Sequence, residues 1–263
     1  MLIILFVLGL IVGSFLNVLV YRLHTAEDLI FDRSKCPHCK NVIRWYDNIP
    51  LLSFIILKFR CRDCKEKISW QYPIVEFLTG SLFVLVGWKF FIVSSVSSWL
   101  PTAYYLFIIS ALLVILVYDL LYMEIPMAVL WVGVFVSIAL GLYFDWIAPA
   151  SLLNTKIYSG ILAAFVAFIF FFALSAGSKE KWMGMGDVYL VILLGLILGW
   201  PKILLALFLA FLLGATYGTI LIAIKKKKMQ SQVPFAPFLV IGTFIALLFY
   251  SPIVSWYFSL FIK

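Results

Sequence analysis

Long apolar runs recur along the whole chain, and this feature restricts its fold more than any other. They cover residues 2–21, 72–93, 102–118, 126–144, 157–175, 188–198, 202–224 and 234–263. A helix needs about 20 apolar residues to cross the hydrocarbon core of a bilayer, whereas the strands of a membrane barrel are shorter and alternate in polarity. We therefore predict an all-α polytopic membrane protein with about eight transmembrane helices.

The composition agrees with this prediction. Hydrophobic residues make up 65% of the chain and charged residues 12%, against about 45–50% and about 25% in soluble domains. The first run, residues 2–21, has no basic start and no small-residue cleavage site, and it contains Gly13, Ser14 and Asn17. A secretory signal peptide has the opposite features. We expect this run to be a retained first helix.

The net charge of +8 would suit nucleic acid, but its distribution indicates a membrane topology instead. With eight helices, sixteen basic residues fall in alternate loops: ten between Arg22 and Lys67, Lys179, Lys181, and Lys225 to Lys228. The other four are Lys89, Lys156, Lys202 and Lys263. Cytoplasmic loops carry the excess of Lys and Arg. We therefore predict that the protein lies in the cell membrane with its N-terminus outside and the loop after the first helix in the cytoplasm. The lysines would also attract anionic lipid headgroups. We expect no nucleic-acid partner.

This long loop contains two cysteine pairs, Cys36-Pro-His-Cys39 and Cys61-Arg-Asp-Cys64, separated by 21 residues. The spacing is typical of a structural zinc site in which four thiolates complete a tetrahedron and leave no open position for catalysis. Two disulfides are the alternative, which a reducing cytoplasm disfavours. We expect His38 to be solvated and not a ligand.

An apolar run between the two pairs, residues 51–57, is too short to span a membrane and is followed by Lys58 and Arg60. Two interpretations stay open. The run packs on the metal module, or it lies at the membrane surface.

Two aspartates lie at the ends of apolar runs, and the predicted topology places both at the same depth. Asp119 comes after residues 102–118, and Asp187 follows Gly184-Met185-Gly186. An ionisable group at membrane depth is costly and marks a functional site by default. We expect the two glycines to let the backbone turn tightly or approach another helix closely. A helix cap is the structural alternative for Asp187.

A third carboxylate, Glu124, is five residues beyond Asp119. On a continuous helix the two side chains would point roughly 140° apart. We therefore expect Glu124 to be an interfacial carboxylate and Asp119 to pair with Asp187. Two nearby carboxylates share one proton, so the ionised member can activate water while the protonated member polarises a carbonyl. This predicts aspartic proteolysis, and a cation or proton pathway is the alternative from a different class.

The ordered set of motifs resembles the bacterial type IV prepilin peptidases over nearly the whole chain. The motifs are Gly13-Ser-Phe-Leu-Asn-Val18, Tyr21-Arg-Leu23, the cysteine pairs, Trp45-Tyr-Asp-Asn-Ile-Pro50, Tyr72-Pro73, Glu76, Asp119, Ile125-Pro126, Gly184-Met-Gly-Asp187 and Pro234-Phe-Ala-Pro-Phe-Leu239. The resemblance implies a membrane aspartic peptidase of the Gly-x-Gly-Asp class that cleaves the leaders of prepilins and pseudopilins at the cytoplasmic face. It also implies N-methylation of the new N-terminus from S-adenosylmethionine, with a peptidase without methylation as the alternative.

Carried over by position, the resemblance makes Asp119 and Asp187 the catalytic pair and Cys36, Cys39, Cys61 and Cys64 the zinc ligands. It implies a first transmembrane helix (1–21), a cytoplasmic module (22–71), a second transmembrane helix with its outer loop (72–100) and a peptidase domain (101–263). Candidates near the methyl donor are Asn17, Asp47 and Glu76.

Two of these candidates have structural alternatives. Asn17 could bridge two helices by a hydrogen bond, and Glu76 is favourable at a helix N-terminus. The sequence departs from the family pattern at His24, Met127 and Ala236, none of which is in the catalytic pair. It indicates neither the oligomeric state nor the individual prepilin.

Overall fold

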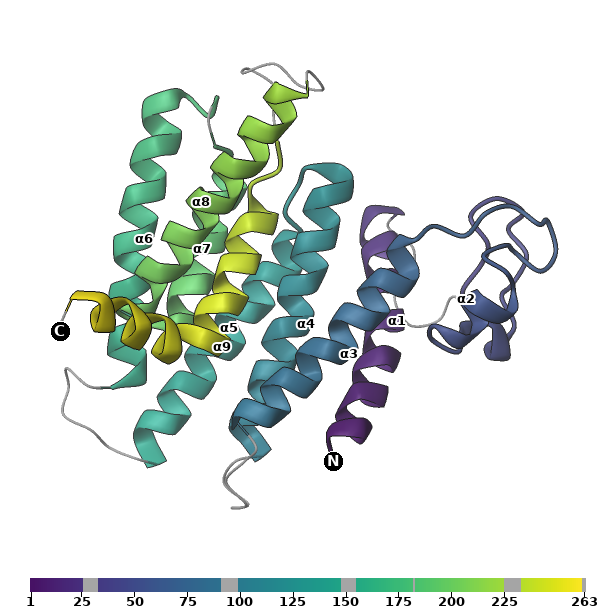
Figure 1. Cartoon of the computed structure of the whole chain (residues 1–263), viewed down its shortest axis with the longest axis horizontal. Helices are drawn as coiled ribbons and strands as arrows, with labels where there is room; N and C mark the ends of the chain where they lie inside the picture. The colour runs from purple at the N-terminus through teal and green to yellow at the C-terminus, as the bar shows by residue number, and fades with distance from the viewer. Residues whose placement is uncertain (26–32, 91–98, 148–154, 182, 225–232, 262–263) are drawn as a thin grey trace. The chain divides into compact units, whose positions relative to one another are not determined.

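The computed structural model describes residues 1–25, 33–90, 99–147, 155–181, 183–224 and 233–261, and these residues form helices and no strands. The helices (Figure 1) are α1 (Leu2–Thr25), η1 (Trp45–Asn48), α2 (Leu52–Ile56), α3 (Gln71–Phe90), α4 (Trp99–Tyr122), α5 (Met127–Ile147), α6 (Lys156–Ser178), α7 (Met185–Leu198), α8 (Lys202–Ala223) and α9 (Ala236–Phe261). Seven are long and apolar enough to cross a membrane, and α7 is a shorter apolar helix. The predicted all-α membrane fold is confirmed. Lys225 to Lys228 lie outside the described residues.

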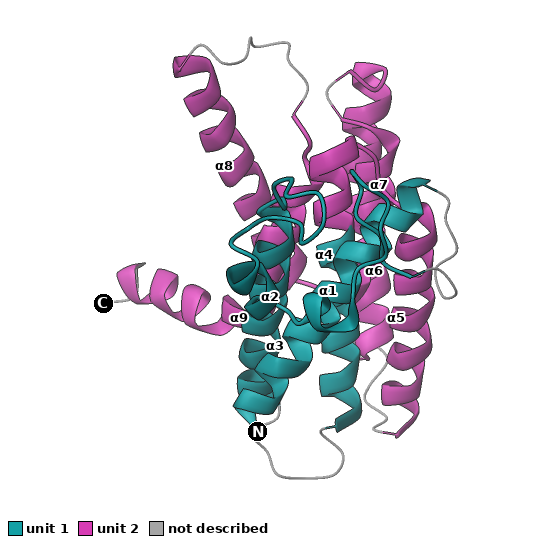
Figure 2. Ribbon diagram, turned by 90° about the vertical axis from the view of Figure 1, so that its right-hand side faces the viewer, with its two compact units in different colours: residues 1–114 teal, residues 115–263 magenta. Residues whose placement is uncertain are grey.

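The chain forms two compact units, residues 1–114 and 115–263 (Figure 2), and the division falls within α4. The four segments expected from the sequence, with boundaries at 21, 71 and 100, stay a prediction.

In the first unit, α1 packs along α3. A Cβ atom on Gly13 would lie 2.7 Å from the Cα atom of Glu76, and one on Gly9 would lie 2.7 Å from the Cα atom of Gly80. The two backbones therefore approach each other closely through small residues, which is how helices associate where lipid removes the hydrophobic driving force. This contact fixes the ends of α1 and α3 that carry the loop between them.

In the second unit, α7 is the central helix and packs against α5, α6, α8 and α9. Each of its 14 residues is buried or half-buried. Its length, about 21 Å, is less than the roughly 30 Å of a hydrocarbon core, but its neighbours and not lipid surround it. A Cβ atom on Gly195 would overlap the backbone of Ala164 in α6, so glycine is required for this close packing.

The substitution Gly195→Ala should therefore destabilise the protein by about 1–3 kcal/mol, the range expected for overpacking a close contact. The matched control is Gly218→Ala in α8, where a Cβ atom would meet nothing within 4 Å and alanine gains up to about 1 kcal/mol of helix propensity. Thermal unfolding in detergent measures both variants. Equal unfolding midpoints for the Gly195→Ala and Gly218→Ala variants would contradict the close α6–α7 contact.

Two helix ends bear on the sequence predictions. We predicted a break in the last helix near Pro252, and α9 has non-helical dihedral angles at Phe249 (φ −125°, ψ 15°), which confirms it. We also assumed that the helix carrying Asp119 continues to Glu124, and this was wrong. It ends at Tyr122, and Met123 takes a left-handed conformation (φ 56°). Glu124 is exposed beyond the helix end, so a chain turn separates it from Asp119.

Candidate functional site

Asp119 lies in the last turn of α4, within the second unit, and its side chain is only 6% exposed. The backbone N–H of Ala236, the first residue of α9, donates a hydrogen bond to its carboxylate. Among the described side chains, Oδ2 of Asp119 is the buried polar atom that has no hydrogen-bond partner. An unpaired buried oxygen is costly, so this atom is placed to receive a water molecule or a substrate group.

Asp187 is the third residue of α7 and is half-buried. Its carboxylate is near enough to that of Asp119 for the two negative charges to interact electrostatically. The N-cap of α7 is Gly184, which provides no side-chain hydrogen bond. Asp187 is therefore not the cap, which removes the structural alternative raised from the sequence.

The two glycines before Asp187 have different environments. Gly184 has ordinary extended dihedral angles (φ −74°, ψ 156°), and a Cβ atom there would meet nothing closer than 4.0 Å. The expected tight turn at Gly184 was therefore wrong. A Cβ atom on Gly186 would lie 3.2 Å from the Ile125 side chain, so Gly186 allows the close approach that we expected. Before the turn, buried Ser175 of α6 donates its hydroxyl to the carbonyl oxygen of Met183 at 3.1 Å.

The four cysteines form the second cluster, in the first unit. All are free thiols, and their Sγ atoms all lie within 4.8 Å of one another. The Cys36 and Cys64 sulfurs are 3.9 Å apart, close to the ~3.8 Å edge of a tetrahedron with zinc–sulfur bonds of about 2.3 Å. The cluster could hold a metal ion, and its four thiols match the donor set of a closed zinc site.

Both cysteine pairs are held by the same backbone pattern. The Cys36 N–H donates to Asn41 O while the Lys40 N–H donates to Cys36 O. In the second pair, the Cys61 N–H donates to Glu66 O and the Lys65 N–H to Cys61 O. Burial raises the pKa of Cys36, but hydrogen bonds from the Cys39 and His38 backbone outweigh it and lower that pKa to about 7. The thiolate form of Cys36, which binds metal, is thereby favoured. The pKa of Cys64 is raised instead, because the lowering effect of a hydrogen bond with the Glu66 backbone is outweighed, in part by hydrogen bonds with the other cysteines.

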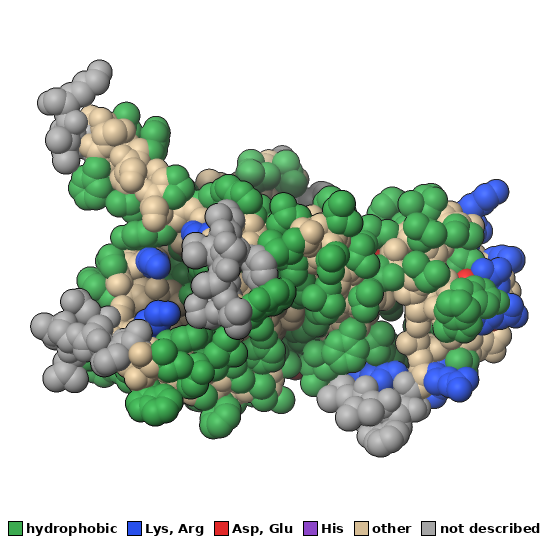
Figure 3. All heavy atoms as spheres, turned by 90° about the horizontal axis from the view of Figure 1, so that it is seen from below, with side chains coloured by type: hydrophobic (Ala, Val, Ile, Leu, Met, Phe, Trp, Pro, Cys, Tyr) green, Lys and Arg blue, Asp and Glu red, His purple; other side chains and the backbone are tan. Residues whose placement is uncertain are grey.

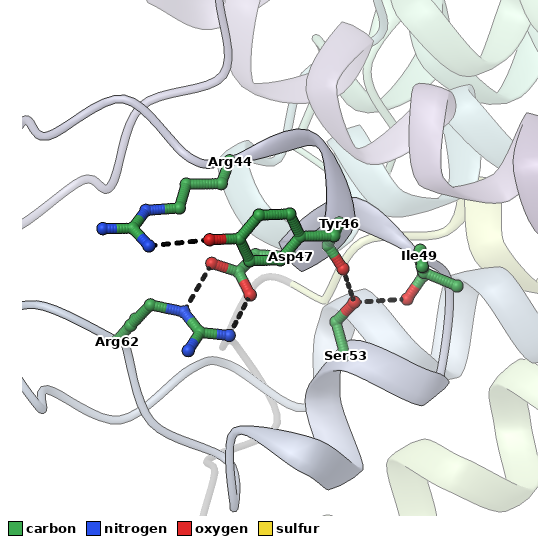
Figure 4. Close-up of polar contacts among 6 residues, drawn as sticks. All are labelled: Arg44, Tyr46, Asp47, Ile49, Ser53 and Arg62. Carbon is green, nitrogen blue, oxygen red and sulfur yellow. Dashed lines mark hydrogen bonds and ion pairs between the residues drawn. The ribbon is translucent and has the colours of Figure 1, made fainter.

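A cavity of about 380 Å³ lies between the cysteine module and the helices α1 and α3 of the same unit. This volume is in the range of small-molecule sites, about 300–1,000 Å³. Asp47 and Arg62 line it and form a two-point ion pair, with distances of 2.6 and 2.9 Å, and Arg44 donates to the Tyr46 hydroxyl beside them (Figure 4). The hydrogen bond from Arg62 holds the pKa of Asp47 below its usual range.

The three candidates for the methyl-donor region take different places. Asp47 and Glu76 line the cavity, and Asn17 does not. Asn17 is buried in α1 and donates from Nδ2 to the Tyr72 carbonyl oxygen at 3.2 Å, so it bridges two segments as its structural alternative predicted. Glu76 is the sixth residue of α3, past the first turn, so the helix-terminus explanation for it was wrong. Its Oε2 atom accepts a hydrogen bond from the Leu51 N–H at 2.8 Å.

Sequence reasoning missed two groups at these sites. Ala236 acts on Asp119 through its backbone N–H, so the interaction does not depend on the Ala236 side chain. The Pro234-Phe-Ala-Pro237 segment was the available signal, because a proline pair fixes the start of a helix. The pairing of Arg62 with Asp47 was missed because charges on an exposed loop give no pairing pattern.

Comparison with known proteins gives consistent matches along the chain. Residues 7–90 match the bacterial peptidase A24 N-terminal domain, and residues 106–219 match the type IV leader peptidase family. A prepilin leader peptidase/N-methyltransferase of Bacillus subtilis (strain 168) is 32% identical over 259 residues, covering 98% of this chain and 98% of the relative. The type 4 prepilin-like proteins leader peptide-processing enzyme of Escherichia coli O78:H11 is 34% identical, with coverage of 89% and 88%. No solved structure matches.

Proposed function

This chain belongs to the type IV leader peptidase family, and we propose that it removes the leader peptide from type IV prepilins and pseudopilins and then methylates the new N-terminus. The observation that carries the peptidase part is the electrostatic interaction of Asp187 with buried Asp119, whose Oδ2 atom has no partner among the described residues. No observation favours an ion or proton carrier.

In the proposed cleavage, the ionised member of the aspartate pair takes a proton from a water molecule, and the resulting hydroxide attacks the scissile carbonyl carbon. The protonated member donates its proton to the carbonyl oxygen, and collapse of the tetrahedral intermediate passes a proton to the leaving amine. The Ala236 N–H fixes the orientation of the Asp119 carboxylate throughout. Gly186 keeps the first turn of α7 close to Ile125 and so keeps Asp187 at the site.

We assign the methylation to the cavity in the first unit. S-adenosylmethionine would supply an electrophilic methyl group there. Glu76, buried in the cavity wall, is placed to accept the proton that the substrate amine loses when it is methylated. The Asp47–Arg62 ion pair would shape the polar side of the cavity. The N-methyltransferase named in the B. subtilis relative supports this activity over a peptidase that does not methylate.

For the four cysteines we propose one structural zinc ion. The thiol donor set and the sulfur separations support this choice, because four thiolates close a tetrahedral zinc site. The protein is a multi-pass membrane protein. From the distribution of Lys and Arg we propose that it lies in the cytoplasmic membrane with the N-terminus outside and both sites at the cytoplasmic face.

Mass spectrometry of a co-expressed prepilin tests both activities together. We expect the pilin to lose its leader and to gain the mass of one methyl group on its new N-terminal residue. A prepilin that stays full length beside well-expressed enzyme would contradict the proposal. A cleaved but unmethylated pilin would leave the peptidase part and exclude the methyltransferase part.

A further inference from the structure

The short helix α2 lies deeper along the membrane helices than a soluble loop would. Its N-cap residue, Leu51, donates its N–H to Glu76 of α3, which also accepts a hydrogen bond from Ser14 of α1. Glu76 is five residues past the start of α3, about 8 Å along its axis, and Ser14 is eight residues before Arg22, about 12 Å. Figures 1 and 2 agree with this position of α2. Both draw α2 beside the middle of α1 and not beyond its end.

The backbone enters and leaves α2 by sharp turns. Leu51 (φ 58°), Lys58 (φ 49°) and Phe59 (φ 65°) all have positive φ angles, which are uncommon for residues other than glycine. These conformations bend the backbone sharply just before and just after α2.

The side chains of α2 divide into an inner and an outer set. Phe54 is buried and contacts Phe59 and Trp70, with ring centroids 4.7 and 5.2 Å apart. Leu52, Ile55 and Ile56 point outward and are 57%, 65% and 65% exposed. Three adjacent exposed aliphatic side chains are unfavourable in water, and at this depth beside α1 they would meet lipid.

The charge next to α2 fits a phospholipid surface. Lys58 and Arg60 follow the helix and are exposed, and Figure 3 shows Lys and Arg side chains gathered over the module. Among residues 33–70 nine basic residues stand against three acidic ones, Asp47, Asp63 and Glu66. Clusters of Lys and Arg next to a membrane helix attract anionic headgroups, and tryptophans such as exposed Trp70 are enriched at the interface.

We propose that α2 inserts into the lipid leaflet next to the module, with Leu52, Ile55 and Ile56 among the acyl chains and Lys58 and Arg60 on anionic headgroups. The module is then held to the bilayer at a third place, besides its connections to α1 and α3. Insertion of about 8–12 Å along the helices agrees with the ~5–10 Å depth of interfacial helices. The inference does not depend on the proposed catalytic functions.

The test uses the unaltered, zinc-loaded full-length protein in nanodiscs of phosphatidylethanolamine and phosphatidylglycerol, with a diazirine on the acyl chain of the phosphatidylglycerol. After irradiation, mass spectrometry locates the lipid adducts. We expect adducts on residues 52–56 at a level similar to that of the exposed α1 residues Ile11 and Phe15. They should exceed those on the cysteine-pair residues Lys40 and Lys65 by about fivefold or more, because only an inserted segment reaches the acyl region.

A variant tests the electrostatic part. The double substitution Lys58→Glu and Arg60→Glu should lower the adduct yield on residues 52–56 severalfold, while Lys40→Glu with Lys65→Glu should not. The proposal is overturned if residues 52–56 of the unaltered protein carry no more adduct than Lys40 and Lys65. It is also overturned if they crosslink to a second copy of the chain, or if adding a prepilin removes the lipid adducts, since α2 would then be a protein-binding surface.

Discussion

Replacing either Asp119 or Asp187 by asparagine should lower the rate of leader cleavage by about 100- to 10,000-fold, the usual contribution of a general acid or base. Asparagine has nearly the same shape but can neither take a proton from water nor donate one as a carboxylic acid. Because cleavage needs both a general base and a general acid, each single variant should lose most of the activity. The measurement is the cleavage rate of a purified prepilin in detergent or nanodiscs.

The matched control is Glu124→Gln, which removes a carboxylate beyond the end of the same helix, where the side chain is exposed. Its cleavage rate should stay near that of the unaltered protein. The asparagine variants should still methylate a precleaved peptide and should fold at least as stably, because each removes a carboxylate that is costly to bury. Normal cleavage by either asparagine variant would exclude the aspartate-pair mechanism.

Replacing Cys36 and Cys61 by serine should release the metal and abolish methylation. We expect about one zinc ion per chain in the unaltered protein, since four thiolates bind one ion, and a large loss of zinc in the variant. Within residues 33–70 the buried side chains are only Cys36, Ser53 and Phe54, so the module has almost no apolar core. Structural zinc contributes about 10–16 kcal/mol to the folding of such modules.

Metal analysis and limited proteolysis measure this effect, and new cleavage sites should appear within residues 33–70. The control His38→Gln alters the same cysteine pair without removing a thiol and should keep its zinc. A cysteine variant that keeps both its zinc content and its protease resistance would contradict the proposed site. Leader cleavage should fall much less than in the Asp119 and Asp187 variants, because both aspartates lie in the second unit.

The membrane helices could be predicted from the sequence because hydrocarbon imposes a length and a composition on each span. Helix ends were less predictable, since they depend on local backbone conformations such as that of Met123. The choice of Asp187 over Glu124 as the partner of Asp119 followed from a helix assumed to be continuous, whereas the structure separates Glu124 by ending α4 at Tyr122.

The contacts made by backbone atoms could not be predicted, because residue type does not reveal them. The hydrogen bond from the Ala236 N–H to Asp119 joins residues more than a hundred positions apart. The hydrogen bond from the Leu51 N–H to Glu76, 25 positions along the chain, is likewise not visible in the residue types. By contrast, the four cysteines could be placed together from their spacing alone, since metal-ligand spacing is a local property of each pair.

The shortness and enclosure of α7 have a consequence for how Asp187 is held in place. A helix of 14 residues is too short to remain in a bilayer by itself, because its ends would leave unpaired backbone groups in hydrocarbon. The helix therefore depends on its neighbours, and its closest backbone approach is to α6, at Gly195 and Ala164. The depth of Asp187, in the first turn of α7, consequently depends on how α7 packs against α5, α6, α8 and α9.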